Sequence, residues 1–202
     1  QNVADKLLSL DAAFATSAGG LTEGLKRVTG VAAEAGLSFD ETAAALTALK
    51  QVTGRSEAVL GNSLKSIFTS LQSEKIQKDL RSIGVETVDT NGEFRNLIPV
   101  INDLSQAFKG LSDTQKAAVT QRVAGKYQAN AFQGLLTAFD GGQFEKALSV
   151  SQNADGSAQK RLDAISKTTE AGLQRLSNNV TKLGSTLGDS LGKPFVDKVA
   201  GY

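Results

Sequence analysis

The most informative part of this sequence is one short stretch, Gly84-Val85-Glu86-Thr87-Val88-Asp89-Thr90-Asn91-Gly92-Glu93-Phe94-Arg95. It interrupts a sequence whose pattern is otherwise helical. Asn91-Gly92 is the dipeptide that best tolerates the positive φ angles of a type I′ turn, and apolar residues flank it on both sides. We therefore expect a small β-hairpin over about residues 85–95. A ribbon this small is marginal alone in water, so Val85, Val88 and Phe94 should dock on neighbouring helices.

Apolar residues at helical spacing occupy the sequence on both sides of this stretch. The cleanest stripe, and the strongest core prediction, is Leu60, Leu64, Ile67, Phe68 and Leu71. Further stripes run through Val3–Phe14, Leu21–Ala32, Phe39–Leu49, Leu97–Phe108 and Tyr127–Phe139. They predict a mainly α fold, a multi-helix block around one small hairpin.

Local signals indicate where these helices begin and end. Ser38 with Glu41, and Ser112 with Gln115, have the spacing of a capping box, which satisfies free backbone N–H groups at a helix start. Pro99 falls in a first helical turn, where its missing N–H costs nothing. Breaks are expected at Gly54, at Gly125 and at Gly141-Gly142.

The C-terminal part has a different character. One apolar seam runs from Leu162 to Leu191 and predicts a helix over about residues 158–191, on the order of 50 Å long. Near its end a set of glycines and leucines repeats every four residues: Gly184, Gly188, Gly192, Leu183, Leu187 and Leu191. Glycines on one helix face allow a second backbone to approach closely, which predicts a helix-contact groove. A frayed helix end with glycines of no consequence is an equal alternative.

The pattern divides the chain into three parts. Residues 1–35 form an N-terminal helical segment, residues 36–152 a helical core block with the hairpin, and residues 153–202 a long helix leading to an extended stalk. The chain contains no Met, so we expect a processed product or, as our preferred interpretation, an excised part of a longer protein.

The composition argues against most kinds of chemistry. There is no His or Cys, so the usual nucleophilic dyads and triads and the preferred zinc ligands are missing. The carboxylate pairs, Asp40 with Glu41 and Asp155 with Asp163, fit helix starts better than acid/base catalysis. Asp89, Asn91 and Glu93 alternate as in a calcium loop but lack its remaining ligands. We expect no catalytic, cofactor-binding or metal-binding residue.

The charge balance also bears on partners. The net charge is +1, from 22 basic and 21 acidic residues. The basic residues are scattered, and only two tyrosines are present to stack on bases. We therefore expect no specific nucleic-acid binding.

Seven short segments extend the pattern set by the central stretch. They are Ala35-Gly36-Leu37-Ser38-Phe39-Asp40-Glu41, Leu80-Arg81-Ser82-Ile83-Gly84-Val85, Asp89-Thr90-Asn91-Gly92-Glu93-Phe94-Arg95, Leu104–Phe108, Gly110-Leu111-Ser112-Asp113, Val123-Ala124-Gly125-Lys126 and Ala131–Leu136. Their order and spacing, over roughly residues 20–192, resemble the core region of bacteriophage tail tape-measure proteins. The hairpin positions that carry this resemblance are Gly84, Val85, Asp89, Asn91, Gly92, Phe94 and Arg95.

The resemblance implies an elongated, self-associating virion protein without enzymatic activity. Such a protein lies in the lumen or tip of the phage tail, determines tail length and leaves the tube before DNA passes. The resemblance further implies three copies, contacts with the tail-tip or baseplate hub and with tail-tube proteins, and synthesis in the cytoplasm of the bacterial host.

Two alternatives remain open at this point. The segment could belong to a tail-associated module that degrades the cell wall, although no catalytic pair stands out. It could also be a membrane-active module that contacts the host membrane during ejection. Against the second, Trp is absent and the basic residues are not concentrated opposite an apolar face.

Overall fold

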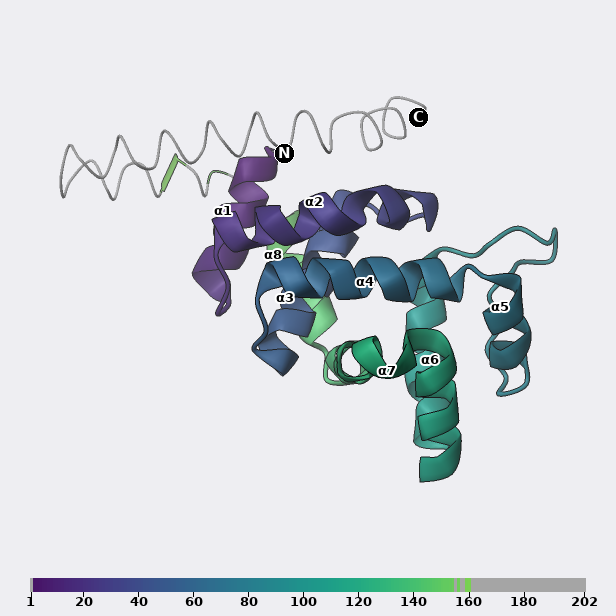
Figure 1. The fold of residues 1–202 in the computed structure, drawn as a ribbon. Coiled ribbons are helices and arrows are strands. Elements are labelled where there is room, and N and C mark those ends of the chain that lie inside the picture. Colours follow the sequence, from purple (N-terminus) through teal and green to yellow (C-terminus); the bar gives the residue numbers. More distant parts are fainter. Residues whose placement is uncertain (1, 155, 157–158, 161–202) are drawn as a thin grey trace.

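The computed structural model describes residues 2–154, 156 and 159–160, and this part of the chain is mainly α-helical (Figure 1). Its helices are α1 (Val3–Ala13), α2 (Ala18–Glu34), α3 (Phe39–Thr53), α4 (Glu57–Leu71), α5 (Glu74–Arg81), α6 (Leu97–Lys109), α7 (Asp113–Asp140) and α8 (Gln143–Gln152). The predicted fold class, mainly α, is confirmed.

Helix α3 lies at the centre of this block. Eight consecutive residues of α3, Thr42–Leu49, are buried, so the helix has no solvent face over two turns. Half of them are alanines: Ala43, Ala44, Ala45 and Ala48. Helices α1, α2, α4, α7 and α8 all contact α3. A helix that is apolar on every side must be enclosed by other elements, and α3 meets that condition.

Among the described helices, α2 and α4 have the most extensive contact with one another, and they lie side by side in Figure 1. Two glycines make this possible. A Cβ atom built on Gly61 would lie 2.2 Å from the carbonyl oxygen of Gly24, and one on Gly24 would lie 2.5 Å from that of Glu57. The predicted α4 stripe packs here, and each of its five apolar residues is fully buried. That core prediction is confirmed.

The predicted helix ends are also confirmed. Ser38 and Ser112 are N-caps, each with both hydrogen bonds of a capping box. Gly54 ends α3 with a left-handed φ of 67°. Gly141 is the C-cap of α7.

The predicted β-hairpin over residues 85–95 is wrong as a two-stranded element. In the described residues this segment has one isolated antiparallel bridge, between Val88 and Phe94, and no strand. The turn is also not type I′, because among the described residues no residue other than glycine has a positive φ. Gly92 N–H donates to the Asp89 carbonyl and Asp89 N–H to the Glu93 carbonyl. This is a three-residue loop ending in a left-handed glycine, which pairs less of the chain than a two-residue loop would.

The side chains of this segment dock unequally. Val85 is buried, and Phe94 is half-buried and packs against the core. Val88 is only half-buried. The segment is therefore a loop whose apolar ends, Val85 and Phe94, pack against the helices. It is not a β-ribbon around which the helices are arranged.

The span labelled α7 is divided at its middle. Gly125 has non-helical angles, φ 59° and ψ −174°, and two helical stretches meet there at a kink, so the break predicted at Gly125 is confirmed. Ala131, Leu135 and Phe139 are buried as predicted, but Tyr127, expected on the same face, is 84% exposed. Tyr127 lies in the first turn after the kink, and no other described element covers it there.

Apart from residues 159–160, the C-terminal helix predicted over residues 158–191 lies outside the described residues. So do the glycine groove positions Gly184, Gly188 and Gly192 with Leu183, Leu187 and Leu191. These remain predictions from the sequence.

Candidate interaction site

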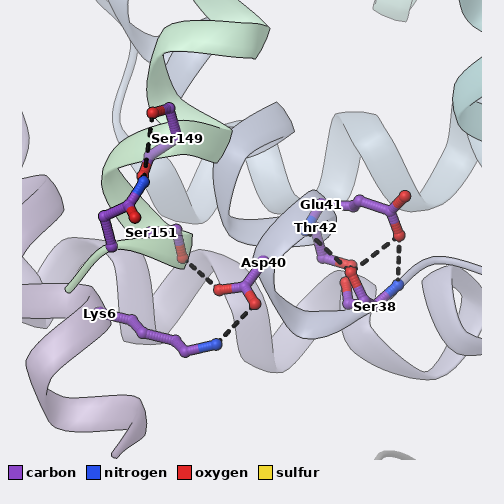
Figure 2. Close-up of polar contacts among 8 residues, drawn as sticks. Lys6, Ser38, Asp40, Glu41, Thr42, Ser149 and Ser151 are labelled. Atoms are coloured by element: carbon purple, nitrogen blue, oxygen red, sulfur yellow. Dashed lines mark hydrogen bonds and ion pairs between the residues drawn. The ribbon is translucent and has the colours of Figure 1, made fainter. Parts of the chain in front are cut away.

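A polar cluster at the start of α3 joins three helices (Figure 2). Asp40, in the first turn of α3, accepts a hydrogen bond from Lys6 Nζ of α1 at 2.6 Å and from Ser151 Oγ of α8 at 2.5 Å. The Lys6 and Asp40 side chains are only 13% and 18% exposed, so their ion pair is largely shielded from water. The cluster ties residues more than a hundred positions apart in the chain.

The neighbouring Glu41 performs a different task in the same turn. Its Oε2 accepts hydrogen bonds from the backbone N–H and the hydroxyl of Ser38, at 2.7 and 2.8 Å. Thr42 donates its hydroxyl proton to the Ser38 carbonyl at 2.8 Å. The two adjacent carboxylates thus point to different partners, Glu41 to the helix cap and Asp40 to other helices (Figure 2).

A second polar group lies where α4 begins. The Glu57 side chain is 10% exposed, accepts a 2.7 Å hydrogen bond from Thr16 Oγ1 and lies 3.8 Å from Lys50 Nζ. Burial alone raises the pKa of Glu57. The hydrogen bonds from Thr16 and from the backbone at Glu57 and Ser17, with the charge of Lys50, outweigh burial and lower this pKa below its ordinary 4.5. Glu57 therefore holds the α1–α2 connection against α3 and α4 as a carboxylate.

The sequence-predicted positions 84–95 form the connection between α5 and α6. Asp89 Oδ1 accepts from the backbone N–H groups of Asn91 and Glu93, at 2.8 and 2.9 Å. The turn itself thus uses the carboxylate of Asp89. Gly84 and Gly92 have φ angles of 82° and 83°, which favour glycine.

Arg95 fixes the end of this connection. Its guanidinium donates to the Glu86 carbonyl at 2.5 Å and lies 3.0 Å from Asp103 Oδ2 of α6. Directly after it, Asn96 Nδ2 donates to the Gly36 carbonyl at 2.7 Å, and Leu97 N–H donates to the Ala35 carbonyl. The segments beginning at Ala35 and at Asp89, which the sequence singled out separately, meet at this point.

A groove opens between α6 and α7. It has a volume of about 340 Å³ and is lined by Ser105, Phe108, Lys109, Lys116, Gln133, Leu136, Thr137 and Asp140. Lys109 and Asp140 form an ion pair at its edge. Phe108 meets Phe132 edge-on, with ring centroids 5.8 Å apart.

Sequence reasoning missed several of these contacts. It had singled out Asp40 but not Lys6 or Ser151, and it had not considered Thr16 or Glu57. No local pattern marks a lysine in one helix as the partner of an aspartate 34 positions later.

The part of the chain that the structure describes lacks two kinds of feature. Within residues 2–154, 156 and 159–160, no three His, Cys, Asp or Glu side chains gather where a metal ion could be held. In the same residues, no helix combines the length and the apolar character needed to cross a membrane.

Comparison with known proteins places these features in context. The family model of phage-related minor tail proteins matches residues 1–125. A probable tape measure protein of Escherichia phage P2 is 24% identical over 176 residues, which cover 84% of this chain and 21% of the relative. A tape measure protein of Pneumococcus phage Dp-1 is 23% identical over 185 residues, 90% of this chain and 16% of the relative. The chain thus spans about a fifth of the first relative and less of the second, and no solved structure matches it significantly.

Proposed function

The chain belongs to the family of phage-related minor tail proteins, and from this premise we propose that it is a structural segment of a tail tape measure. In this role it resides in the lumen or tip of the tail, contributes to setting tail length and leaves the tube before DNA ejection. The observation that carries the proposal is the similarity, over 84% and 90% of this chain, to two proteins named as tape measures. A helix advances a fixed distance per residue, so helical chain length can be converted into tube length.

The described contacts fit a protein that acts by packing. The described acidic side chains discussed above bind neighbouring helices, caps or turns: Asp40, Glu41, Glu57 and Asp89. The proposal therefore assigns no reaction to the described residues. Contact with the host membrane stays a prediction of the sequence.

Antibody labelling of phage particles tests whether the protein lies inside the tail. Antibodies raised against residues 1–154 should label the tail only after tails are disrupted, because the proposed position is enclosed by the tube. The label should be lost from particles that have ejected their DNA. Labelling of the capsid, or of the outer surface of intact tails, would contradict the proposal.

Tail length tests the measuring role. An in-frame deletion within helical parts of the full-length protein should shorten the tail by about 1.5 Å per residue removed. A series of deletions separates this relation from a general assembly defect, since only measurement gives lengths that scale with the number of residues. Unchanged tail length in the viable deletions would refute it.

We further propose that the chain self-associates, as a trimer, and that it contacts tail-tip and tail-tube proteins. Light scattering should then give about three times the 21.1 kDa of one chain. If the glycine groove forms the contact, Gly188→Leu should lower this mass, whereas Ser185→Leu, which the helical pattern places on another face, should not. An unchanged mass in the Gly188→Leu chain would remove the groove from the proposal.

A further inference from the structure

Asn91-Gly92 combines the features that make an asparagine prone to lose its side-chain amide. It is the one place in the sequence where glycine follows asparagine. Glycine has no side chain, so its backbone nitrogen can come closer to the asparagine side chain than that of any other residue. Both residues are exposed and lie in the loop between α5 and α6. In the described part of the chain the Asn91 side chain forms no hydrogen bond, so nothing there holds it away from the Gly92 nitrogen.

Asn96, at the end of the same connection, is exposed but held in place. Its Nδ2 donates to the Gly36 carbonyl at 2.7 Å, and its Oδ1 accepts from the Ile98 N–H at 2.9 Å. The next residue, Leu97, is buried, and its N–H donates to the Ala35 carbonyl at 3.2 Å. Two nearby asparagines thus differ in the freedom of both groups that such a reaction requires.

The loop also restrains Asn91-Gly92, but through the backbone. The Gly92 N–H donates to the Asp89 carbonyl at 3.1 Å. On either side of it, the N–H groups of Asn91 and Glu93 donate to Asp89 Oδ1, at 2.8 and 2.9 Å. The Gly92 nitrogen must leave this arrangement before it can react. The folded loop should therefore slow the reaction relative to an unfolded chain.

We propose that Asn91 is a site of spontaneous deamidation and that the hydrogen bonds to Asp89 set its rate in the folded chain. The Gly92 nitrogen gives its proton to a solvent base and bonds to Asn91 Cγ. The bond between Cγ and the side-chain nitrogen breaks, and this nitrogen takes up a proton from solvent and leaves as ammonia. Water then opens the resulting succinimide ring. Cleavage of the Cγ–N bond gives aspartate, and cleavage at the main-chain carbonyl gives isoaspartate, whose backbone is one atom longer.

Either product changes the connection between α5 and α6. A neutral amide becomes a carboxylate between Asp89 and Glu93, and the net charge of +1 falls by one. Isoaspartate also lengthens the backbone between Val88 and Phe94, which form the isolated bridge. The modification concerns the chemistry of the loop and does not depend on the proposed function.

Peptide mapping of the full 202-residue chain, incubated at mildly alkaline pH, tests the site. Trypsin cleaves after Arg81 and Arg95, so Asn91 is the sole asparagine of the peptide 82–95. Mass spectrometry detects the exchange of NH₂ for OH, and chromatography separates the two products. The peptide 96–109, which contains Asn96 and Asn102, is the internal control and should stay unchanged while 82–95 converts. Conversion of the control peptide at the same rate or faster would overturn the site.

A variant of Asp89 tests the control by the loop. Asp89→Ala removes two hydrogen bonds and should raise the rate of conversion about tenfold. Thr90→Ala is the matched control, because the Thr90 side chain forms no hydrogen bond within the described residues, and it should leave the rate unchanged.

The unaltered chain provides a second comparison. Its conversion should be faster in urea, where the loop is unfolded, than in the folded state. Equal rates in the two states, or an unchanged rate in Asp89→Ala, would overturn the role of Asp89. If Asp89→Ala fails to fold, the comparison with urea decides.

Discussion

At the residue scale, the α2–α4 contact depends on the absence of side chains. The Gly24 carbonyl oxygen occupies the space that a Cβ atom on Gly61 would need. The contact atom belongs to the backbone, so it cannot rotate away as a flexible side chain could. A single added methyl group must therefore move a helix.

Substitution of this glycine provides a direct test. Gly61→Ala should lower the free energy of unfolding by about 1–3 kcal/mol, since overpacking forces backbone shifts. Gly30→Ala, in α2, is the control: a Cβ there meets nothing within 4 Å. It should stabilise the chain by roughly 0.5–1 kcal/mol through helix propensity. Urea unfolding measures both, and effects of the same sign would contradict the close approach.

The lowered pKa of Glu57 makes a pH-dependent contribution to stability. A carboxyl group whose pKa is lower in the folded chain stabilises that chain above its ordinary pKa of 4.5. This stabilisation is lost as the pH falls through the lowered value. Thr16→Val removes the hydrogen bond to Glu57 and should cost about 1.5–3 kcal/mol at pH 7.

The cost of Thr16→Val should shrink as the pH falls below 4.5. Thr29→Val is the control, because the Thr29 hydroxyl donates to the Leu25 carbonyl and has no charged partner. Its cost should vary little with pH. Equal pH profiles for the two variants, in denaturant titrations, would show that Glu57 is not the partner that matters.

At the element scale, Asp40 links α3 to α1 and α8. Removing its charge leaves Lys6 largely buried without its partner. We expect a coupling energy of about 1–3 kcal/mol between Lys6→Met and Asp40→Asn in a double-mutant cycle of unfolding free energies. The control cycle, Glu74→Gln with Lys78→Met, uses a pair whose side chains are 80% and 70% exposed and should show much weaker coupling. Similar couplings in the two cycles would mean that the Asp40 cluster is no better shielded than the surface.

The elements also show what the sequence can and cannot predict. Capping boxes and apolar stripes act within a few residues, so the ends of α3 and the buried face of α4 followed directly from the chain. The hairpin prediction failed because Asn91-Gly92 permits a type I′ turn but does not require one, and Asp89 favoured a longer loop by accepting two backbone hydrogen bonds. Tyr127 was misplaced because periodicity shows which residues share a helix face but not how far along the helix other elements cover that face. The contacts of Asp40 and Glu57 join distant parts of the chain, for which one sequence contains no signal.

At the scale of the whole molecule, one hydrophobic cluster extends from Leu7 to Ala147 among the described residues. Helices α1 and α2 contribute to it together with the later helices. The boundary predicted after residue 35 remains untested, as does the one at residue 153. The first of these boundaries falls between helices that contact one another.

A truncation tests the boundary at residue 153. A chain that ends at Ala154 contains the entire described cluster, so its melting temperature should lie within a few degrees of the full chain and its unfolding should remain cooperative. Circular dichroism during heating measures both quantities. A large loss of cooperativity would place later residues within the same folding unit.

The enclosure of α3 has a consequence for how amide hydrogens exchange with solvent deuterium. Peptide groups of Thr42–Leu49 are surrounded by other helices, so they should become deuterated only when the whole block opens. Their exchange rates should report the global free energy, while those of the loop around Asp89 should report local opening alone. Mass spectrometry of peptides from these two regions would thus measure the free energies of global and of local opening in one experiment.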